Sequence, residues 1–223
     1  MPVKPKMREK VMKMSRFTYC VYAVIALGAS MYCACAQSAD LTPDAQRAAA
    51  KTVAEVCGSC HGVNGRSISP TFPNLAGQTA PYIETQLKAF KDQSRADPDA
   101  QAYMWGMAAQ LNDGMISALA AYYAGQPPAP PAKAGDPALI AKGKRLFEEG
   151  VPARQIPPCA SCHGSHAEGQ VVFPRLAGQH APYLLKQLLV IQNVLRIAPV
   201  MHGVIKDLTK DQMQSVVAYL ESI

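Results

Sequence analysis

Apolar residues recur every three to four positions in several stretches of this chain, which is the spacing of amphipathic helices. Two such stretches stand at matching places in the two halves of the sequence. Their apolar residues are Ile83, Leu87 and Phe90 in the first stretch and Leu184, Leu188 and Ile191 in the second. Neither half shows the period-two alternation of a half-buried strand. The pattern therefore predicts an all-α fold.

Residues that favour helix termini place the ends of the other predicted helices. A helix over 43–56 would begin after Thr42 as its N-cap, with proline at the first helical position, where its missing N–H costs nothing. A counterpart over 136–149 opens with Asp and Pro. The final helix of the first half would begin near Asn112, and that of the second half near Thr209. The two halves are thus predicted to be built alike.

An internal repeat accounts for this likeness, because residues 57–123 recur as residues 159–219. The run Phe-Pro-Asn-Leu-Ala-Gly-Gln-Thr-Ala-Pro-Tyr at 72–82 returns as Phe-Pro-Arg-Leu-Ala-Gly-Gln-His-Ala-Pro-Tyr at 173–183. Chance does not produce such a match. The chain is therefore a tandem duplication.

A proline-rich stretch over 126–132 separates the two copies. Its prolines cannot continue a helix, and they favour an extended, semi-rigid connector. We therefore predict a first domain over 37–125, a linker over 126–135 and a second domain over 136–223.

The first 36 residues have the pattern of an export signal. A basic segment is followed by an apolar run over 17–33, and the small-x-small sequence Ala-Cys-Ala at 34–36 resembles a cleavage site. We predict a signal peptide over 1–36, cleavage near Ala36 and export to the periplasm. The alternative is an uncleaved anchor, since a run of about 17 apolar residues is at the lower limit of what crosses a bilayer.

Charge and composition narrow the classes of function. The chain is 49% hydrophobic and 17% charged, as in globular proteins, and it carries a formal net charge of +6. The predicted leader holds six of the 22 basic residues and one of the 16 acidic ones, so the mature protein is left near +1. The basic pI therefore does not indicate a nucleic-acid partner.

The cysteines carry the strongest chemical signal. Three of the seven lie in the leader, and the other four form two C-x-x-C pairs, each followed directly by histidine, which is the attachment pattern of c-type haem. The alternatives are disulfides, a redox dithiol and a zinc site, but zinc needs four ligands in one closed site, and here each pair has its own repeat and its own histidine. We predict two covalently bound haem c groups. The attachment residues would be Cys57 and Cys60, with His61 on iron, and Cys159 and Cys162, with His163 on iron.

A sixth iron ligand should come from equivalent places in both copies. Met104 and Met201 meet this requirement, 43 and 38 residues after their histidines. Pro199 favours an irregular loop around Met201. Met107 is instead interpreted as core filler, because Val204 stands at the matching position.

Histidine is the alternative sixth ligand in the second copy. His202 neighbours Met201, and imidazole binds iron well, but its counterpart Trp105 cannot be a ligand. His166 and His180 are also present, although polar surface roles are commoner for such residues. Methionine in both copies is the simpler interpretation.

These motifs resemble the dihaem cytochrome c4 family over nearly all of the predicted mature chain. The shared features are tandem C-x-x-C-H copies, each followed by Phe-Pro-x-Leu-Ala-Gly-Gln and then by a methionine ahead of a C-terminal Ala-Tyr helix. The resemblance implies two class I cytochrome c domains packed face to face, with His/Met ligation of both haems.

The resemblance also implies roles for residues near each haem. The carbonyls of Pro73 and Pro174 would accept hydrogen bonds from the two iron-binding histidines, and Leu75 and Leu176 would pack against haem. The second copy departs from the first in two ways, because its stretch from histidine to methionine is five residues shorter and His202 stands beside the ligand.

The function expected from these features is one-electron transfer, without enzymatic activity. The resemblance implies a periplasmic carrier, soluble or loosely membrane-associated, that passes electrons from a quinol-oxidising complex to a terminal oxidase. An alternative is the electron-accepting subunit of a dehydrogenase, such as a flavocytochrome c sulfide dehydrogenase. A dihaem peroxidase is the third possibility and would require an open iron position. The sequence has no Ser/His/Asp constellation, phosphate loop or dinucleotide fingerprint.

Overall fold

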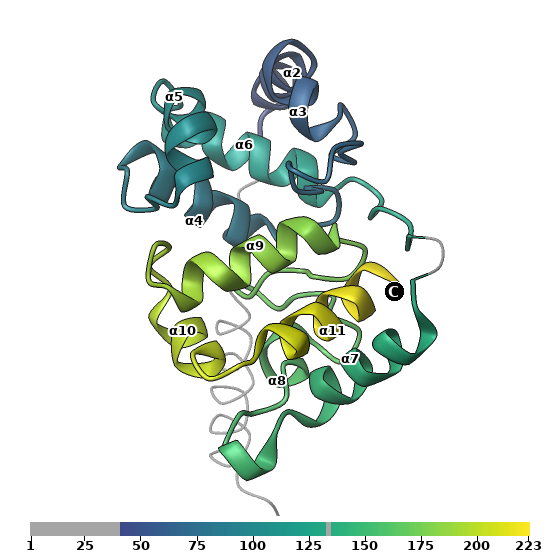
Figure 1. Ribbon diagram of the computed structural model, residues 1–223. Helices are drawn as coiled ribbons and strands as arrows, with labels where there is room; N and C mark the ends of the chain where they lie inside the picture. Colours follow the sequence, from purple (N-terminus) through teal and green to yellow (C-terminus); the bar gives the residue numbers. More distant parts are fainter. Residues whose placement is uncertain (1–40, 133–134) are drawn as a thin grey trace, which may run out of the picture. The chain divides into compact units, whose positions relative to one another are not determined.

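The computed structural model describes residues 41–132 and 135–223, which form helices joined by loops (Figure 1). Within these ranges the only β-structure is two isolated bridges, and none of the helices is long and apolar enough to span a membrane. The prediction of an all-α fold is confirmed. The predicted leader over 1–36, with its cleavage site, lies outside the described residues.

The two halves contain the predicted helices in the same order. The first half contains α2 (Pro43–Thr52), η1 (Val53–Cys57), α3 (Gly58–His61), α4 (Ala80–Lys91), η2 (Ala100–Met104), α5 (Trp105–Ala108) and α6 (Asp113–Ala124). The second half contains α7 (Pro137–Glu149), η3 (Pro152–Arg154), α8 (Ala160–His163), α9 (Ala181–Gln192), α10 (Pro199–Ile205) and α11 (Lys210–Glu221). Here η1 and η2 are π-helical turns and η3 is a 3₁₀ turn.

The helix termini follow the capping signals of the sequence. The hydroxyl of Thr42 accepts from the N–H of Ala45 at the start of α2, and Asn112 accepts from Met115 at the start of α6. Thr209 forms a full capping box at the start of α11. The helix predicted over 43–56 is α-helical only as far as Thr52, where α2 ends. Its last turn is the wider π-helical turn η1. Such π-turns occur often at functional sites, and this one leads directly into the first C-x-x-C-H motif.

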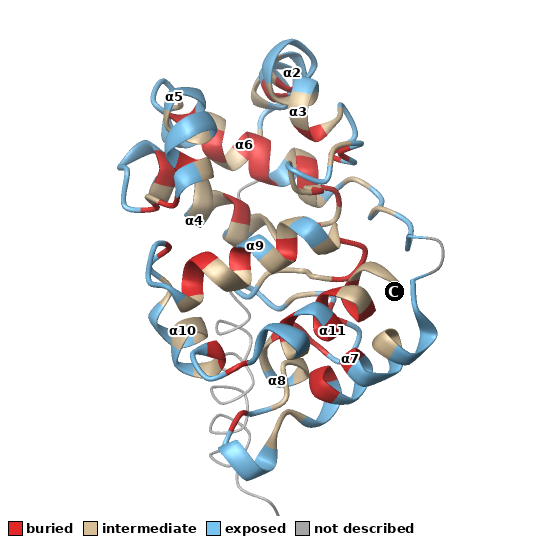
Figure 2. Cartoon of the chain, viewed as in Figure 1, coloured by how far each residue is buried: buried red, intermediate tan, exposed pale blue. Residues whose placement is uncertain are grey.

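Each half has its own apolar core. In the first half α6 packs against α2 and α4, and in the second half α11 packs against α7 and α9. Figure 2 marks buried residues along α6 and α11. The amphipathic faces predicted for α4 and α9 are confirmed, since Ile83, Phe90, Leu184 and Ile191 are all buried.

The two halves belong to one compact unit, Leu41–Ile223. Residues of the proline-rich stretch contribute to it, because Arg66 donates from Nε and Nη2 to the carbonyl of Pro127, at 3.1 and 2.9 Å. Side chains of the first half also bond directly to the second half. Arg95 donates to Gln187 on α9, and Arg196 donates to the hydroxyl of Tyr82 on α4.

Candidate functional site

The two C-x-x-C-H motifs adopt the same local structure. In each motif the first cysteine is the N-cap of a single helical turn formed by the other four residues, α3 in the first half and α8 in the second. The serine inside each motif bonds back to the chain before it: Ser59 donates to the carbonyl of Val56 at 2.8 Å, and Ser161 donates to that of Pro158 at 2.6 Å. The helical turn thus brings the two thiols of each motif and the histidine that follows them into one short segment.

Both motif histidines are held by a backbone carbonyl. The Nδ1 atom of His61 lies 3.0 Å from the carbonyl oxygen of Pro73, and Nδ1 of His163 lies 2.9 Å from that of Pro174. A carbonyl can only accept, so Nδ1 carries the proton in each ring and the lone pair is left on Nε2. The proline contacts implied by the family resemblance are present in both halves.

Burial keeps these histidines in the form that binds metal. Each is only 7% exposed, and burial lowers the pKa of His61 and of His163 against the opposing effect of the proline carbonyl. The neutral imidazole is the metal-binding form of histidine. The sequence suggested no pKa, since that depends on what the fold buries.

A left-handed glycine ends each motif. Gly62 has φ of +75° and Gly164 has φ of +86°, a region that residues with a side chain rarely adopt. A β-carbon at Gly62 would meet the carbonyl oxygen of Arg66, and one at Gly164 would meet the carboxylate of Glu168. The glycine therefore permits the reversal that carries the chain from the histidine toward the proline that holds it.

The cysteines do not have the properties of a redox dithiol. Cys57, Cys60, Cys159 and Cys162 are half-buried and form no disulfide in the described part of the chain. Burial raises the pKa of the Cys159 thiol to about 11 and also raises the pKa of Cys57. Redox-active C-x-x-C pairs need a thiol with a lowered pKa, so this alternative is disfavoured.

The two candidate sixth ligands lie at matching positions of the repeat, but their local secondary structure differs. Met104 is the last residue of η2 and packs against the cluster formed by Phe90, Ala100 and Ala108. Met201 lies within α10 and packs against the core of the second half. The predicted irregular loop at Met201 is wrong, because Pro199 begins α10, and the start of a helix tolerates proline well.

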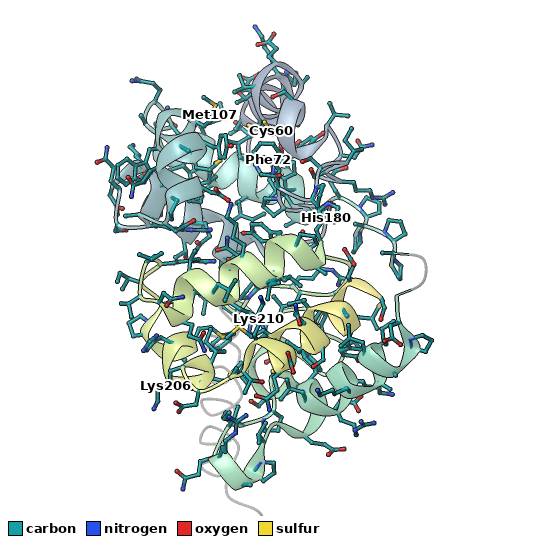
Figure 3. The ribbon with its side chains drawn as sticks, in the orientation of Figure 1. Cys60, Phe72, Met107, His180, Lys206 and Lys210 are labelled. Atoms are coloured by element: carbon teal, nitrogen blue, oxygen red, sulfur yellow. The ribbon has the colours of Figure 1, made fainter. Side chains whose placement is uncertain are left out.

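Aromatic contacts connect the histidine to the methionine segment in the first half. The ring of Phe72, labelled in Figure 3, lies 6.0 Å from that of His61 and 5.3 Å from that of Tyr103, edge to face in both cases. Tyr103 directly precedes Met104. The second half keeps only the first contact, between His163 and Phe173 at 6.3 Å, because the counterpart of Tyr103 is the exposed Val200.

The residues beside the two methionines share a structural role. The indole N–H of Trp105 donates to the carbonyl of Arg95 at 2.9 Å, and Nδ1 of His202 lies 3.0 Å from the carbonyl of Ile191. Each ring thus ties its methionine segment to the chain before it. Met107 is exposed, which does not fit the predicted role of core filler.

The other two histidines have different surroundings. His166 is exposed, as a polar surface residue would be. His180, labelled at the start of α9 in Figure 3, is half-buried, and its Nε2 lies 3.0 Å from the carbonyl of Ser67 in the first half. It therefore contributes to the contact between the halves, which the sequence did not indicate.

Two glutamines near the histidines were missed by the sequence analysis. Gln179 bonds to the backbone of Asn74 in the other half, and Gln78 bonds to the backbone of Arg175 in the same way. The available signal was a glutamine at the same place in both copies. Repetition alone does not say whether such a residue bonds within its own copy or across to the other.

The residues present fit haem as the bound group. Each half supplies two free thiols for attachment and one histidine Nε2 for iron. In addition, the Nε atom of Arg175 is buried and has no hydrogen-bond partner among the described residues. An unused guanidinium donor suits the acidic groups that haem carries on its edge.

Comparison with known proteins agrees with this class of site. The sequence model of the Cytochrome c family matches residues 47–125 and 140–223. The fold and the site are those of a c-type cytochrome with two domains in tandem. The chain belongs to the cytochrome c family, and it is an electron-transfer protein with two covalently bound haem c groups rather than an enzyme.

Individual relatives specify the branch of the family. Cytochrome c-552 of Acidithiobacillus ferridurans is 40% identical over 207 residues, which is 92% of this chain and 87% of that protein. The solved structure of Acidithiobacillus ferrooxidans cytochrome c4 has 43% identity and a TM-score of 0.71, and the match covers 75% of this chain and 98% of that one. The resemblance to dihaem cytochrome c4 is thereby confirmed.

A third relative is named for a different role. The "thiosulfate dehydrogenase electron acceptor" of Thiomonas intermedia is 34% identical over 206 residues, which is 90% of this chain and 89% of that protein.

Proposed function

We propose that this protein is a periplasmic carrier that takes up and releases electrons one at a time, with one haem site in each half. Cys57 and Cys60 would attach the first haem and Cys159 and Cys162 the second. His61 with Met104 would bind the first iron, and His163 with Met201 the second. The observation that carries this proposal is the pair of histidine–proline contacts, which leave one buried Nε2 lone pair beside each C-x-x-C.

The chain's own residues would define how the sites work. Covalently bound haem supplies a reversible one-electron couple. The proline carbonyls fix the tautomer and the plane of each histidine. A methionine sulfur at the sixth position favours reduced iron and raises the potential. With a histidine and a methionine bound to each iron, neither site would leave room for oxygen or peroxide.

The electron donor and acceptor follow from the class of carrier. We propose a quinol-oxidising complex as donor and a terminal oxidase as acceptor, as the resemblance to cytochrome c4 implies. The Thiomonas intermedia relative supports a second candidate, in which the donor is a dehydrogenase and this chain is its electron acceptor. The name of that relative points to thiosulfate oxidation, whereas a flavocytochrome c sulfide dehydrogenase was the example given for this alternative from the sequence.

The first experiment tests the sites. Purified holoprotein should contain two covalently attached haems per chain and should titrate as two one-electron centres. The reduced protein should not change its visible spectrum when carbon monoxide is added. Carbon monoxide binding at either site in the native protein would contradict the carrier and favour a peroxidase-like enzyme.

The second experiment separates the two proposed roles. Reduced holoprotein is mixed with membranes that contain a terminal oxidase, and oxygen uptake is followed with and without cyanide. In parallel, oxidised holoprotein is mixed with thiosulfate and a thiosulfate dehydrogenase. Cyanide-sensitive oxygen uptake supports the respiratory carrier. Rapid reduction by the dehydrogenase without any oxidation by membranes supports the second role.

A further inference from the structure

The peptide group that holds each histidine is itself held by the other half of the molecule. The carbonyl of Pro73 accepts from Nδ1 of His61, and the N–H of the same peptide group, on Asn74, donates to Oε1 of Gln179 at 2.9 Å. Gln179 completes the contact by donating from Nε2 to the carbonyl of Asn74, also at 2.9 Å. A histidine of the first half is thus linked through one peptide unit to a side chain of the second half.

The same arrangement occurs in the opposite direction. The carbonyl of Pro174 accepts from Nδ1 of His163, and the N–H of Arg175 donates to Oε1 of Gln78 at 2.7 Å. Gln78 in turn donates from Nε2 to the carbonyl of Arg175 at 3.0 Å. The two glutamines stand at matching positions of the repeat, so the two links are reciprocal.

These links lie in a setting that makes hydrogen bonds effective. Gln78 and Gln179 are buried, 6% and 5% exposed, and Asn74 is buried as well. Little water can therefore compete for the peptide groups, and a hydrogen bond in such a setting is stronger than one in solvent. Substitution of either glutamine by an apolar residue would leave the peptide N–H without a hydrogen-bond acceptor, because water would not replace the lost side chain.

A peptide group transmits polarisation from its N–H to its carbonyl. The C–N bond is conjugated with the carbonyl, so an acceptor on the N–H moves negative charge onto the oxygen. Hydrogen bonds in a chain strengthen one another in this way. The hydrogen bond that Gln179 accepts from the N–H of Asn74 should therefore make the Pro73 oxygen a stronger acceptor for His61. Gln78 should have the same effect on Pro174 and His163.

We propose that Gln78 and Gln179 are positioning residues through which each half sets the reduction potential of the haem site in the other half. The inference rests on the proposed function, since it takes His61 and His163 to be iron ligands. A stronger acceptor on Nδ1–H makes the histidine a more basic ligand, which favours oxidised iron. Removal of one glutamine should then raise the potential of the site in the opposite half.

The test uses the full-length holoprotein with Gln179→Leu and Gln78→Leu made separately. Reduction is followed by NMR, with the amide signals of Gly62 and Gly164 as separate reporters for the two sites. For Gln179→Leu we expect the equilibrium constant for reduction of the His61 site to rise about two- to tenfold, the range of one ordinary hydrogen bond. For Gln78→Leu the same rise is expected at the His163 site.

Hydrogen exchange gives a second readout. The amide of Asn74 should exchange faster in Gln179→Leu and remain protected in Gln78→Leu, and the amide of Arg175 should show the reverse. The matched control is Thr79→Val. It removes a hydrogen bond between the same two halves, from Oγ1 of Thr79 to the carbonyl of Val171 at 2.6 Å, and leaves intact both peptide groups that hold the histidines. This variant should leave the difference between the two reduction potentials unchanged.

The proposal requires that each substitution shift the reduction potential of the site in the opposite half. Equal shifts at both sites, or a shift confined to the half that carries the substitution, would overturn the proposal. Gln179→Met, which keeps the length of the side chain, replaces Gln179→Leu if that variant retains fewer than two haems. Loss of haem in both variants would also overturn it, because the glutamine would then build the contact rather than tune a site. Failure of the proposed function is distinct: wild-type protein would itself lack two covalently bound haems.

Discussion

Nη2 of Arg95 lies 2.9 Å from Oε1 of Gln187, and both side chains are buried between the two halves. The same Gln187 oxygen accepts from Nη1 of Arg196 at 2.6 Å, and Nε of Arg95 pairs with Asp97 at 2.9 Å. Asp97 is 1% exposed. Two guanidinium groups and a single carboxylate therefore share one buried network, in which the neutral Gln187 amide connects residues of both halves.

Loss of Arg95 should be costly for this network. The variant Arg95→Met leaves the Asp97 carboxylate buried without its cation, which typically costs about 3–5 kcal/mol. Equilibrium unfolding of the haem-loaded protein in guanidinium measures the change. Addition of Asp97→Asn to the variant should recover part of the loss. An exposed pair provides the control, since Lys51→Ala removes only the contact with Glu55 and should cost less than about 1 kcal/mol. Similar losses in both variants would contradict a buried charge network.

Gly143 lies where α7 packs tightly against α11. A β-carbon at this position would run into the carbonyl of Ser215 and the side chain of Tyr219. Gly143→Ala should therefore destabilise the protein by about 1–3 kcal/mol through overpacking, measured as a lower midpoint of thermal unfolding. Gly114→Ala is the control, because a β-carbon there would meet only the Asn112 side chain at an ordinary contact distance of 3.5 Å, and it should be neutral or slightly stabilising. Equal behaviour of the two variants would show that the helices can separate at no cost.

Tyr103 should stabilise methionine ligation in the first half alone. Its ring packs on Phe72, which packs on His61, so Tyr103→Ala removes a contact that holds the segment before Met104. An aromatic pair contributes about 0.5–1.5 kcal/mol, so imidazole should displace the first-site methionine at a concentration about two- to tenfold lower. A spectroscopic titration of the oxidised protein with imidazole measures this. Val200→Ala, at the matching position, should leave the titration of the second site unchanged.

His202 is predicted to support the second site without being a ligand. Its Nδ1 contact with the Ile191 carbonyl matches the contact of the Trp105 indole with Arg95. His202→Trp introduces the residue that the first copy has at the matching position. This variant should keep the far-red absorption band of iron–methionine ligation. Loss of half of this band in His202→Trp, with Met201 intact, would identify His202 as the ligand instead.

Features that depend on local chain chemistry could be predicted from the sequence. Thr42, Asn112 and Thr209 cap helices as expected, because a cap needs only the side chain and the backbone within three residues of it. The helical state of the Met201 segment was missed for a related reason, since proline is compatible with both a loop and the first turn of a helix.

Contacts between the halves could not be predicted. Asp97 and Arg95 look like ordinary surface charges in the sequence, yet both are buried in the fold, and Arg95 bonds to Gln187 on α9 of the other half. Gln78 and Gln179 likewise bond to residues about 100 positions away, and no local pattern records such a pairing. The repeat showed that the two halves are equivalent, but the packing between them depends on the whole surface of each.

We propose that Met104 and Met201 each place a sulfur on one of two haem irons. The most direct test is the far-red iron–thioether absorption band of the oxidised protein, compared among wild type, Met104→Ala, Met201→Ala and the double variant, with Met107→Ala as the control. We predict that each single variant loses about half of the band, that the double variant loses all of it, and that Met107→Ala retains it in full. An undiminished band in the double variant would contradict the account.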